Sequence, residues 1–281
     1  MSRTIHVDQI IEAVREMCME ANYDLADDMK DALNQAAGRE ESPLGCRILE
    51  QLQENLSIAS AEKIPICQDT GMAVIFCEIG QDLHIEGGYI GDALCLGVKK
   101  GYEEGYLRKS VVKDPFIREN TRDNTPPVIH YEIVPGQNLK ITLAPKGFGS
   151  ENMSRVFMLK PADGMEGAKQ AIIEAVKDAG PNACPPVVVG VGIGGTFEKA
   201  AIMAKQALTR PVGTFSEKDH IRQMEKEVLE EINSLGIGPA GLGGRVTALA
   251  VHINTYPTHI AGLPVAVNMC CHVNRHICRE L

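Results

Sequence analysis

The sequence contains no tryptophan, and aromatic residues make up only 4% of its 281 residues. Its core must therefore consist mainly of aliphatic side chains, alanine and methionine. The sequence also lacks a run of lysine and arginine, and its formal net charge is −9. Because a nucleic-acid-binding protein needs a basic surface to neutralise phosphates, the composition argues against nucleic acid as a partner. An anionic substrate would need a local cluster of cations, a metal or helix N-termini.

Long apolar segments are absent as well. No apolar run reaches the length that a helix needs to span a bilayer, and Arg3, Asp8, Glu12 and Arg15 interrupt the N-terminal segment where a signal peptide would be apolar. We therefore expect a cytoplasmic protein without a membrane partner. The nine cysteines are an odd number, which argues against a disulfide framework. Metal-binding, catalytic and plainly buried thiols stay open.

The pattern of apolar residues predicts an α/β chain of the α+β kind. Helices are expected over 7–36 (two helices), 44–57, 89–107, 165–179, 196–208 and 216–235, the last with a capping box formed by Ser216 and Asp219. Strands are expected over 72–79, 128–134, 139–144, 246–253 and 263–269. The strands 128–134 and 139–144 are joined by Pro135–Asn138 and predict a β-hairpin.

No internal repeat and no linker divides the chain. We therefore expect a single catalytic domain over 1–281. A helical N-terminal lobe, about 1–60, should pack on an α/β lobe, about 61–281, that contains a mixed β-sheet with helices.

Four cysteines stand in turns rather than in apolar helical patterns. Cys67 follows Pro65, Cys184 lies between Gly-Pro and Pro-Pro pairs, and Cys270 and Cys271 end a predicted strand. In a turn, a thiolate can point at a ligand while nearby backbone N–H groups bond the sulfur. Ordinary buried thiols are the alternative interpretation.

The wide spacing of these cysteines favours one kind of metal centre over another. A structural zinc site usually has closely spaced pairs such as CxxC, and none is present. Three well-separated cysteines are more typical of an iron–sulfur cluster. A four-iron cluster held by three thiolates leaves one iron open, and that iron can act as a Lewis acid.

The stretch 190–195 matches the GxGxxG pattern of dinucleotide-binding proteins, but its context does not. A Rossmann unit needs a second strand ending in Asp or Glu about twenty residues later, and the segment LTRPVGTFSEKDH is not a strand. We therefore reject nicotinamide cofactor binding. The glycines can instead allow close packing of a strand against a helix.

Four segments together resemble the class I (iron–sulfur) fumarate hydratases over nearly the whole chain: ICQDTG (66–71), KGFGSENMS (146–154), GPNACPPVVVGVGIGGT (180–196) and THIAGLPVAVNMCCHVNRH (258–276). The related L-tartrate dehydratase alpha subunits share the first motif and NACPP, whereas GSENMS is more similar to the fumarate hydratases. The resemblance implies the α/β N-terminal domain of that family, with a 4Fe–4S cluster that keeps one iron open.

By that resemblance, the cluster ligands are Cys67, Cys184 and Cys271, with Cys270 as the rival for the third position. Gln68 and Asp69 match the active-site pair of the family, and Asp69 would exchange the proton in general acid–base chemistry.

The resemblance implies further site residues. His259 matches a histidine of the family's catalytic site, although a lone histidine is often structural. Arg108 matches an arginine that binds a substrate carboxylate, with Arg118 and Arg122 as alternatives. Gly149 and Ser150 would offer substrate-binding donors.

The implied function is the reversible hydration of fumarate to L-malate, a reaction of the tricarboxylic acid cycle. Ten residues follow Cys271, whereas single-chain members carry a further domain there. We therefore expect an alpha subunit that acts in a hetero-oligomer with a beta subunit, on a small dicarboxylate. The alternatives are an L-tartrate dehydratase alpha subunit and a non-catalytic iron–sulfur or zinc-binding module.

Overall fold

The structure is a computed structural model that describes residues 3–281. The chain divides into two compact units. The first unit comprises the residues up to Ala26 together with Leu56–Phe148 and Arg275–Leu281, and the second comprises Asp27–Asn55 and Gly149–Asn274. The N-terminal helices divide between these two units.

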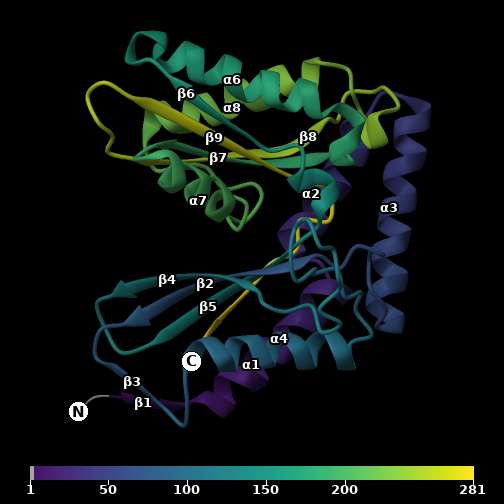
Figure 1. Cartoon of the computed structure of the whole chain (residues 1–281). Coiled ribbons are helices and arrows are strands. Elements are labelled where there is room, and N and C mark those ends of the chain that lie inside the picture. The colour runs from purple at the N-terminus through teal and green to yellow at the C-terminus, as the bar shows by residue number, and fades with distance from the viewer. Residues whose placement is uncertain (1–2) are drawn as a thin grey trace. The chain divides into compact units, whose positions relative to one another are not determined.

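The first unit contains two long helices, a four-stranded sheet and a two-stranded sheet (Figure 1). Its elements are β1 (Arg3–His6), α1 (Val7–Tyr23), β2 (Met72–Gly80), β3 (Leu83–Glu86), α4 (Ile90–Glu104), β4 (Val128–Val134), β5 (Leu139–Lys146) and β10 (Ile277–Glu280). Helix α3 (Pro43–Glu62) begins in the second unit and ends in the first.

Helices α1 and α4 form one core with the larger sheet of the first unit. Ile10, Val14 and Met17 recur at helical spacing on α1 and are fully buried. They pack with Ile75 of β2 and Ile141 of β5 in the same apolar cluster. Alternate residues of a strand face one side of a sheet, so this contact explains why the apolar residues of β2 and β5 are spaced by two.

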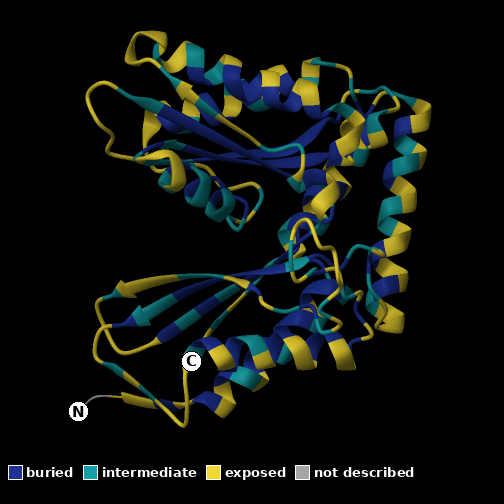
Figure 2. Cartoon of the chain, in the orientation of Figure 1, coloured by how far each residue is buried: buried dark blue, intermediate teal, exposed yellow. Residues whose placement is uncertain are grey.

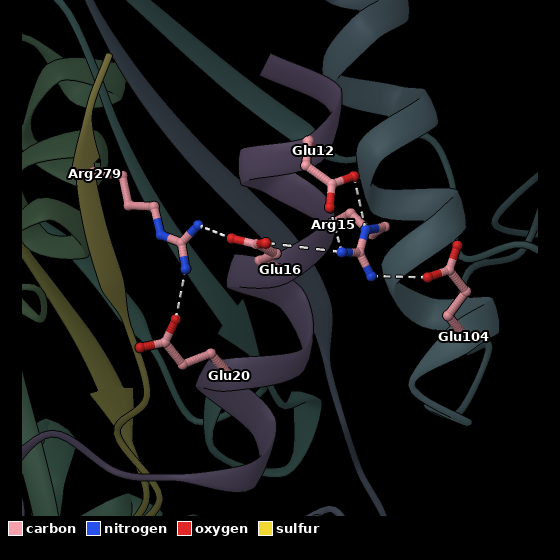
Figure 3. A network of polar contacts seen from close by, with 6 residues as sticks. All are labelled: Glu12, Arg15, Glu16, Glu20, Glu104 and Arg279. Atoms are coloured by element: carbon pink, nitrogen blue, oxygen red, sulfur yellow. Dashed lines mark hydrogen bonds and ion pairs between the residues drawn. The ribbon is translucent and has the colours of Figure 1, made fainter. Parts of the chain in front are cut away.

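The C-terminal strand is held to α1 by charged side chains as well. Arg279 of β10 pairs with Glu16 and Glu20 of α1, whereas Arg15 pairs with Glu12 and with Glu104 of α4 (Figure 3). Partly exposed pairs of this kind contribute little each, about 0 to 1 kcal/mol.

The predicted β-hairpin of 128–144 is wrong in its pairing. The order of the sheet is β10-β5-β2-β4, so that β2 lies between the two expected partners, parallel to β4 and antiparallel to β5. The turn after β4 crosses the end of β2, where Gly80 donates to Asn138 O and Asp82 donates to Gly136 O. A Cβ at Gly80 would lie 2.6 Å from Gly136 O, so glycine is required at this crossing.

The second unit is a sheet of order β6-β9-β7-β8 with helices on both faces. Helices α6 and α8 cover one face and α7 covers the other (Figure 1). Its elements are α2 (Asp27–Arg39), α5 (Phe148–Glu151), β6 (Arg155–Leu159), η1 (Pro161–Asp163), α6 (Gly164–Ala179), η2 (Gly180–Ala183), β7 (Val187–Gly194), α7 (Phe197–Ala207), α8 (Asp219–Ser234), η3 (Pro239–Gly241), β8 (Ala248–Tyr256) and β9 (Leu263–Cys270).

Two glycines of the stretch 190–195 allow close packing of β7 against α7. Gly190 and Gly192 lie in β7, and Cβ atoms there would lie 2.2 Å and 2.1 Å from backbone oxygens of α7. The helix can therefore approach the strand closely only because these side chains are absent.

Most of the expected elements are present within a few residues of their predicted bounds, and the α+β class is confirmed. The predicted capping box of α8 is not formed, since Lys218 occupies the N-cap and makes no side-chain cap bond. Within residues 3–281, no helix combines the length and the apolar character that crossing a bilayer requires.

Candidate functional site

The turn 66–71 of the first unit holds the carboxylate of Asp69 in a fixed orientation. Its Oδ1 accepts a hydrogen bond from Gly71 N (3.0 Å) and its Oδ2 accepts one from Phe148 N (3.0 Å). Cys67, two residues earlier, is half-buried. Because each carboxylate oxygen has two lone pairs, both oxygens keep an acceptor position for a further partner.

Two glycines make this orientation possible. Gly71 has φ +77°, and a Cβ there would lie 2.7 Å from Lys146 N. A Cβ at Gly147 would lie 3.1 Å from Asp69 Oδ2. The ICQDTG turn can therefore approach the end of β5 this closely only with glycine at 71, and a side chain at 147 would require the Asp69 carboxylate to shift by a few tenths of an ångström.

Buried side chains also hold the turn 66–71 in place by hydrogen bonds. Tyr102 donates to Thr70 O (2.8 Å), and burial raises the pKa of Tyr102, so that its hydroxyl stays protonated as a donor. Thr70 Oγ1 donates to Arg108 O (3.1 Å). Asn124 donates to Gly71 O (3.1 Å) and accepts from Ser110 N (2.7 Å). These bonds tie the turn to the segment that carries Arg108.

The three candidate arginines lie in the long segment between α4 and β4. The backbone of Arg108 lies against the turn next to Asp69, and its side chain is exposed, as is that of Gln68. Arg118 and Arg122 are exposed on the long loop between α4 and β4. The backbone of Arg108 and the segment that follows Arg122 are thus both bonded to the turn of Asp69, through Thr70 and Gly71.

Arg275 was not predicted as a site residue. Its Nη2 donates to Asp69 O and its Nε donates to Pro145 O (3.3 Å), although only 4% of the residue is exposed. Its Nη1 is buried and has no hydrogen-bond partner among the described residues. The sequence offered one signal for this role: Arg275 is a cation between the polar residues Asn274 and His276, close after the cysteine pair.

In the second unit, the structure brings two of the predicted cysteine turns together. Cys184 directly follows η2 and has left-handed backbone angles (φ 54°, ψ 64°). The residue is exposed. His272, which directly follows Cys271, contacts the carbonyl of Cys184 through its Nδ1 (3.1 Å) and its N–H (3.5 Å). Positions 184 and 271 are therefore neighbours in space.

The two candidates for the third thiol differ in their surroundings. Cys270 is the last residue of β9, pairs with Val188 and is buried, with 5% exposed. Cys271 lies just beyond the strand and is half-buried. Because a ligand needs an accessible sulfur, this difference favours Cys271.

The loop with Gly149 and Ser150 lies beside the same part of the second unit. A Cβ at Gly149 would be 3.9 Å from Asn182 O, in the segment that leads to Cys184. Ser150 is buried. Glu151 pairs with Lys205 and accepts from Asn268 (2.8 Å), which anchors the loop to α7 and β9.

His259 is not with these groups. It lies in the loop between β8 and β9, at the opposite end of β9 from Cys271. The eight residues of β9 separate them by roughly 25 Å. His259 instead lines a largely apolar cavity of about 470 Å³ with residues such as His220 and Tyr256. Within the second unit, the structure therefore does not support a common site for His259 and the cysteines.

The thiols of the cysteine turns in each unit are donors of the kind that iron–sulfur clusters use. Cys184 is exposed, and Cys67 and Cys271 are half-buried. In the first unit, the buried Nη1 of Arg275 is an N–H donor without a partner among the described residues, of the kind that sulfur ligands accept. Within neither unit do residues 3–281 gather three His, Cys, Asp or Glu side chains close enough for one ion. A closed zinc site of four such ligands is therefore not formed inside either unit.

A comparison with protein-family models finds one match that decides the family. The model described as "Fumarate hydratase (Fumerase)" matches residues 11–280.

The chain belongs to this fumarate hydratase family.

Full-length relatives agree with the family. A Methanocaldococcus jannaschii protein named "Putative L(+)-tartrate dehydratase subunit alpha" is 42% identical over 97% of this chain and 98% of its own length. Two Escherichia coli proteins named "L(+)-tartrate dehydratase subunit alpha", from strains UTI89 and K12, are 32% and 31% identical over 96% of this chain and 89% of their own. The chain is thus a hydro-lyase of the fumarate hydratase family, similar in extent to its alpha subunits.

Proposed function

We propose that this chain is the alpha subunit of an iron–sulfur hydro-lyase that adds water reversibly to a four-carbon dicarboxylate. Fumarate and L-malate are the first candidate substrates. Dehydration of L(+)-tartrate is the second candidate, favoured by the names of the relatives.

One observation carries the proposal. The carboxylate of Asp69 stands two residues after Cys67 and is fixed through both oxygens by backbone N–H groups, from Gly71 and Phe148. A carboxylate held in one orientation beside a ligand for a metal centre is suited to proton transfer at a group bound there.

Cys67, Cys184 and Cys271 would hold the 4Fe–4S cluster. With one iron not bound by protein, such a cluster supplies a Lewis acid that polarises a substrate hydroxyl. Asp69 gives its proton to the hydroxyl oxygen as the carbon–oxygen bond breaks, and it takes that proton back in the hydration direction. The hydrogen bonds from Gly71 and Phe148 keep its carboxyl group aimed while the proton moves.

Substrate carboxylates need cationic or N–H donors. Arg108, whose backbone carbonyl accepts from Thr70, would contact a substrate carboxylate in a bidentate manner through its guanidinium. Gln68, Gly149 and Ser150 supply further donors. We give His259 no role in this chain's own site, because β9 separates it from Cys271.

A beta subunit completes the enzyme in this proposal, since the relatives are named as alpha subunits. It would contribute the base that removes the proton from the neighbouring carbon. We propose a cytoplasmic hetero-oligomer, in which reducing conditions preserve the thiolates and the cluster.

The test is anaerobic reconstitution of the full chain with iron and sulfide, alone and with its beta subunit. Iron and sulfide are counted, and fumarate, L-malate and both tartrate enantiomers are assayed. About four irons per chain and turnover only with the beta subunit are expected. The substrate with the highest kcat/KM decides between the two candidates. A chain that binds no iron, or a complex inactive on all four compounds, would refute the proposal.

A further inference from the structure

Arg275 is a buried cation without an ion-pair partner. Only 4% of the residue is exposed, and its guanidinium bonds to two backbone carbonyls. Among residues 3–281, no carboxylate forms an ion pair with it. Arginine cannot be deprotonated in proteins, and buried charges are normally paired because their transfer out of water is costly. The surroundings of Arg275 therefore suit an anion that the described residues do not supply.

The guanidinium also keeps unused hydrogen-bond donors. It has five N–H groups, and two of them are used: Nε donates to Pro145 O (3.3 Å) and Nη2 donates to Asp69 O. Nη1 is buried and has no hydrogen-bond partner among residues 3–281. Because the group is planar, Nη1 lies on the side away from the N–H of Nε. A buried N–H without an acceptor is costly, so this end of the side chain calls for an acceptor.

The guanidinium lies beside the turn that carries Cys67 and Asp69. A Cβ at Gly147 would lie 3.1 Å from Asp69 Oδ2 and 3.8 Å from Arg275 Nη2. The strands that end here, β2 and β5, have no exposed residue, and Figure 2 shows β2 mostly in the buried colour. Cys67 precedes Asp69 by two residues, so their Cα atoms are at most about 7 Å apart. A group bound to Cys67 would therefore be close to Arg275.

An iron–sulfur cluster would supply both the anion and the acceptor. With three thiolate ligands it carries a net negative charge, and its sulfur atoms accept hydrogen bonds from nearby N–H groups. The Asp69 carboxylate does not fill this role, since its oxygens accept from Gly71 N and Phe148 N and form no ion pair with Arg275. A substrate carboxylate is less suited, because Nη1 is shielded from solvent.

We propose that Nη1 of Arg275 donates a hydrogen bond to a sulfur atom of the cluster, at the thiolate of Cys67 or at a sulfide next to it. The inference rests on the proposed function, because it needs a cluster at Cys67. Arg275 then acts in two directions: Nη2 holds the carbonyl of Asp69, and Nη1 stabilises the cluster. A cation and an N–H donor at sulfur both favour the reduced, more negative cluster, so they raise its reduction potential.

Wild type tests the contact without a substitution. The full chain is produced with arginine that carries nitrogen-15 in its guanidinium and is reconstituted anaerobically with iron and sulfide. After reduction with dithionite, electron–nuclear double resonance should detect a nitrogen coupling from a guanidinium. Transfer of the oxidised sample to D2O should shift the Fe–S stretching frequencies in the resonance Raman spectrum, because a deuteron replaces the bonded proton.

Arg275→Gln assigns these signals to one side chain. It removes the cation and the donor, so the nitrogen coupling should disappear and the D2O shift should shrink. The reduction potential of the cluster should fall, and its resistance to an iron chelator should decrease about 10- to 100-fold.

Two controls separate this contact from general support of the turn. Arg279→Gln removes an arginine that pairs only with Glu16 and Glu20 and should change none of the signals. Tyr102→Phe removes the donation to Thr70 O and loosens the turn without touching Arg275, so it should keep the nitrogen coupling.

Iron and sulfide counts separate failure of this proposal from failure of the proposed function. Wild type with about four irons but without a guanidinium coupling would overturn the hydrogen bond alone. A chain that binds no iron would overturn both proposals. An Arg275→Gln variant that folds and keeps the coupling, the potential and the chelator resistance of wild type would also overturn the hydrogen bond. If that variant does not fold, the wild-type spectra decide.

Discussion

The guanidinium of Arg275 donates to the main-chain carbonyl of Asp69, 206 residues earlier in the chain. A second donation, from Nε to Pro145 O, ties the end of β5 to the same side chain. One buried arginine thus fixes the turn that presents Asp69, and it does so from the segment that directly follows the Cys271 turn.

Replacement of Arg275 should destabilise the protein more than replacement of the nearby, partly exposed Arg279. Arg275→Gln leaves the carbonyls of Asp69 and Pro145 without their donor and should lower the free energy of unfolding by about 1–3 kcal/mol. It should also reduce kcat, because Asp69 loses its support. Arg279→Gln, on the same C-terminal segment, removes only the partly exposed pairs of Arg279 with Glu16 and Glu20 (Figure 3) and should cost less than about 1 kcal/mol. Equal losses in chemical denaturation would contradict this role.

Asp69→Asn should keep the shape of the turn and remove the proton donor. We expect kcat of the reconstituted enzyme to fall by about 10²- to 10⁴-fold, with iron content and substrate affinity near those of wild type. Asp82→Asn, at an exposed position after β2, is the control. Full turnover in the Asp69 variant would remove this residue from the mechanism.

Cys270→Ala and Cys271→Ala form a matched pair. If Cys271 is the third ligand, Cys271→Ala should fail to retain a full cluster after anaerobic reconstitution, whereas Cys270→Ala should retain it. Since Cys270 is buried, its replacement should cost mainly stability. Iron counts and the visible absorption of the cluster distinguish the two, and the reverse result would assign Cys270 as the ligand.

Gly71→Ala should destabilise the first unit strongly. The left-handed backbone costs about 1–2 kcal/mol for any residue with a Cβ, and the collision with Lys146 adds to it. Gly136→Ala is the control, because Gly136 also has positive φ (111°) but nothing within 4 Å of the added Cβ. Thermal unfolding should show a clearly larger loss for Gly71→Ala, and similar losses would disprove the close approach.

His252 should make the stability of the protein dependent on pH. Burial, together with the charge of Arg210, lowers the pKa of His252 to about 4, whereas an unfolded histidine titrates near about 6.5. Between these values the unfolded chain binds the proton more readily, so the contribution is complete above about pH 6.5 and is lost as the pH falls toward 4. The difference in unfolding free energy between wild type and His252→Asn should therefore grow as pH rises through this range. A constant difference would contradict the burial of a neutral imidazole.

Local sequence patterns predicted the helices and most of the strands well, because helical and alternating periodicities depend on near neighbours. The helix 165–179 and the strand 263–269 are examples, and both are present as α6 and β9. The hairpin of β4 and β5 failed for the opposite reason. Its two strands and its turn have the local pattern of a hairpin, yet β2 lies between the strands. The residues of the segment itself do not indicate that a strand from much earlier in the chain pairs with both.

The candidate site shows the same division. The motif residues Cys67, Asp69, Cys184 and Cys271 were recognisable by their types and neighbours, but Arg275 was not, since a single arginine has no periodicity. His259 had the right residue type, and the length of β9 removes it from the cysteines of its unit.

The sequence by itself determined the family, the residue types of the chemistry and the local elements, because these depend on residues that are close together in the chain. Only the tertiary structure decided that Arg275 holds Asp69, that His272 joins the turns of Cys184 and Cys271, and that β4 lies at an open edge. Each of these facts depends on strand order and on contacts between residues far apart in sequence, and those are set by the packing of each unit as a whole.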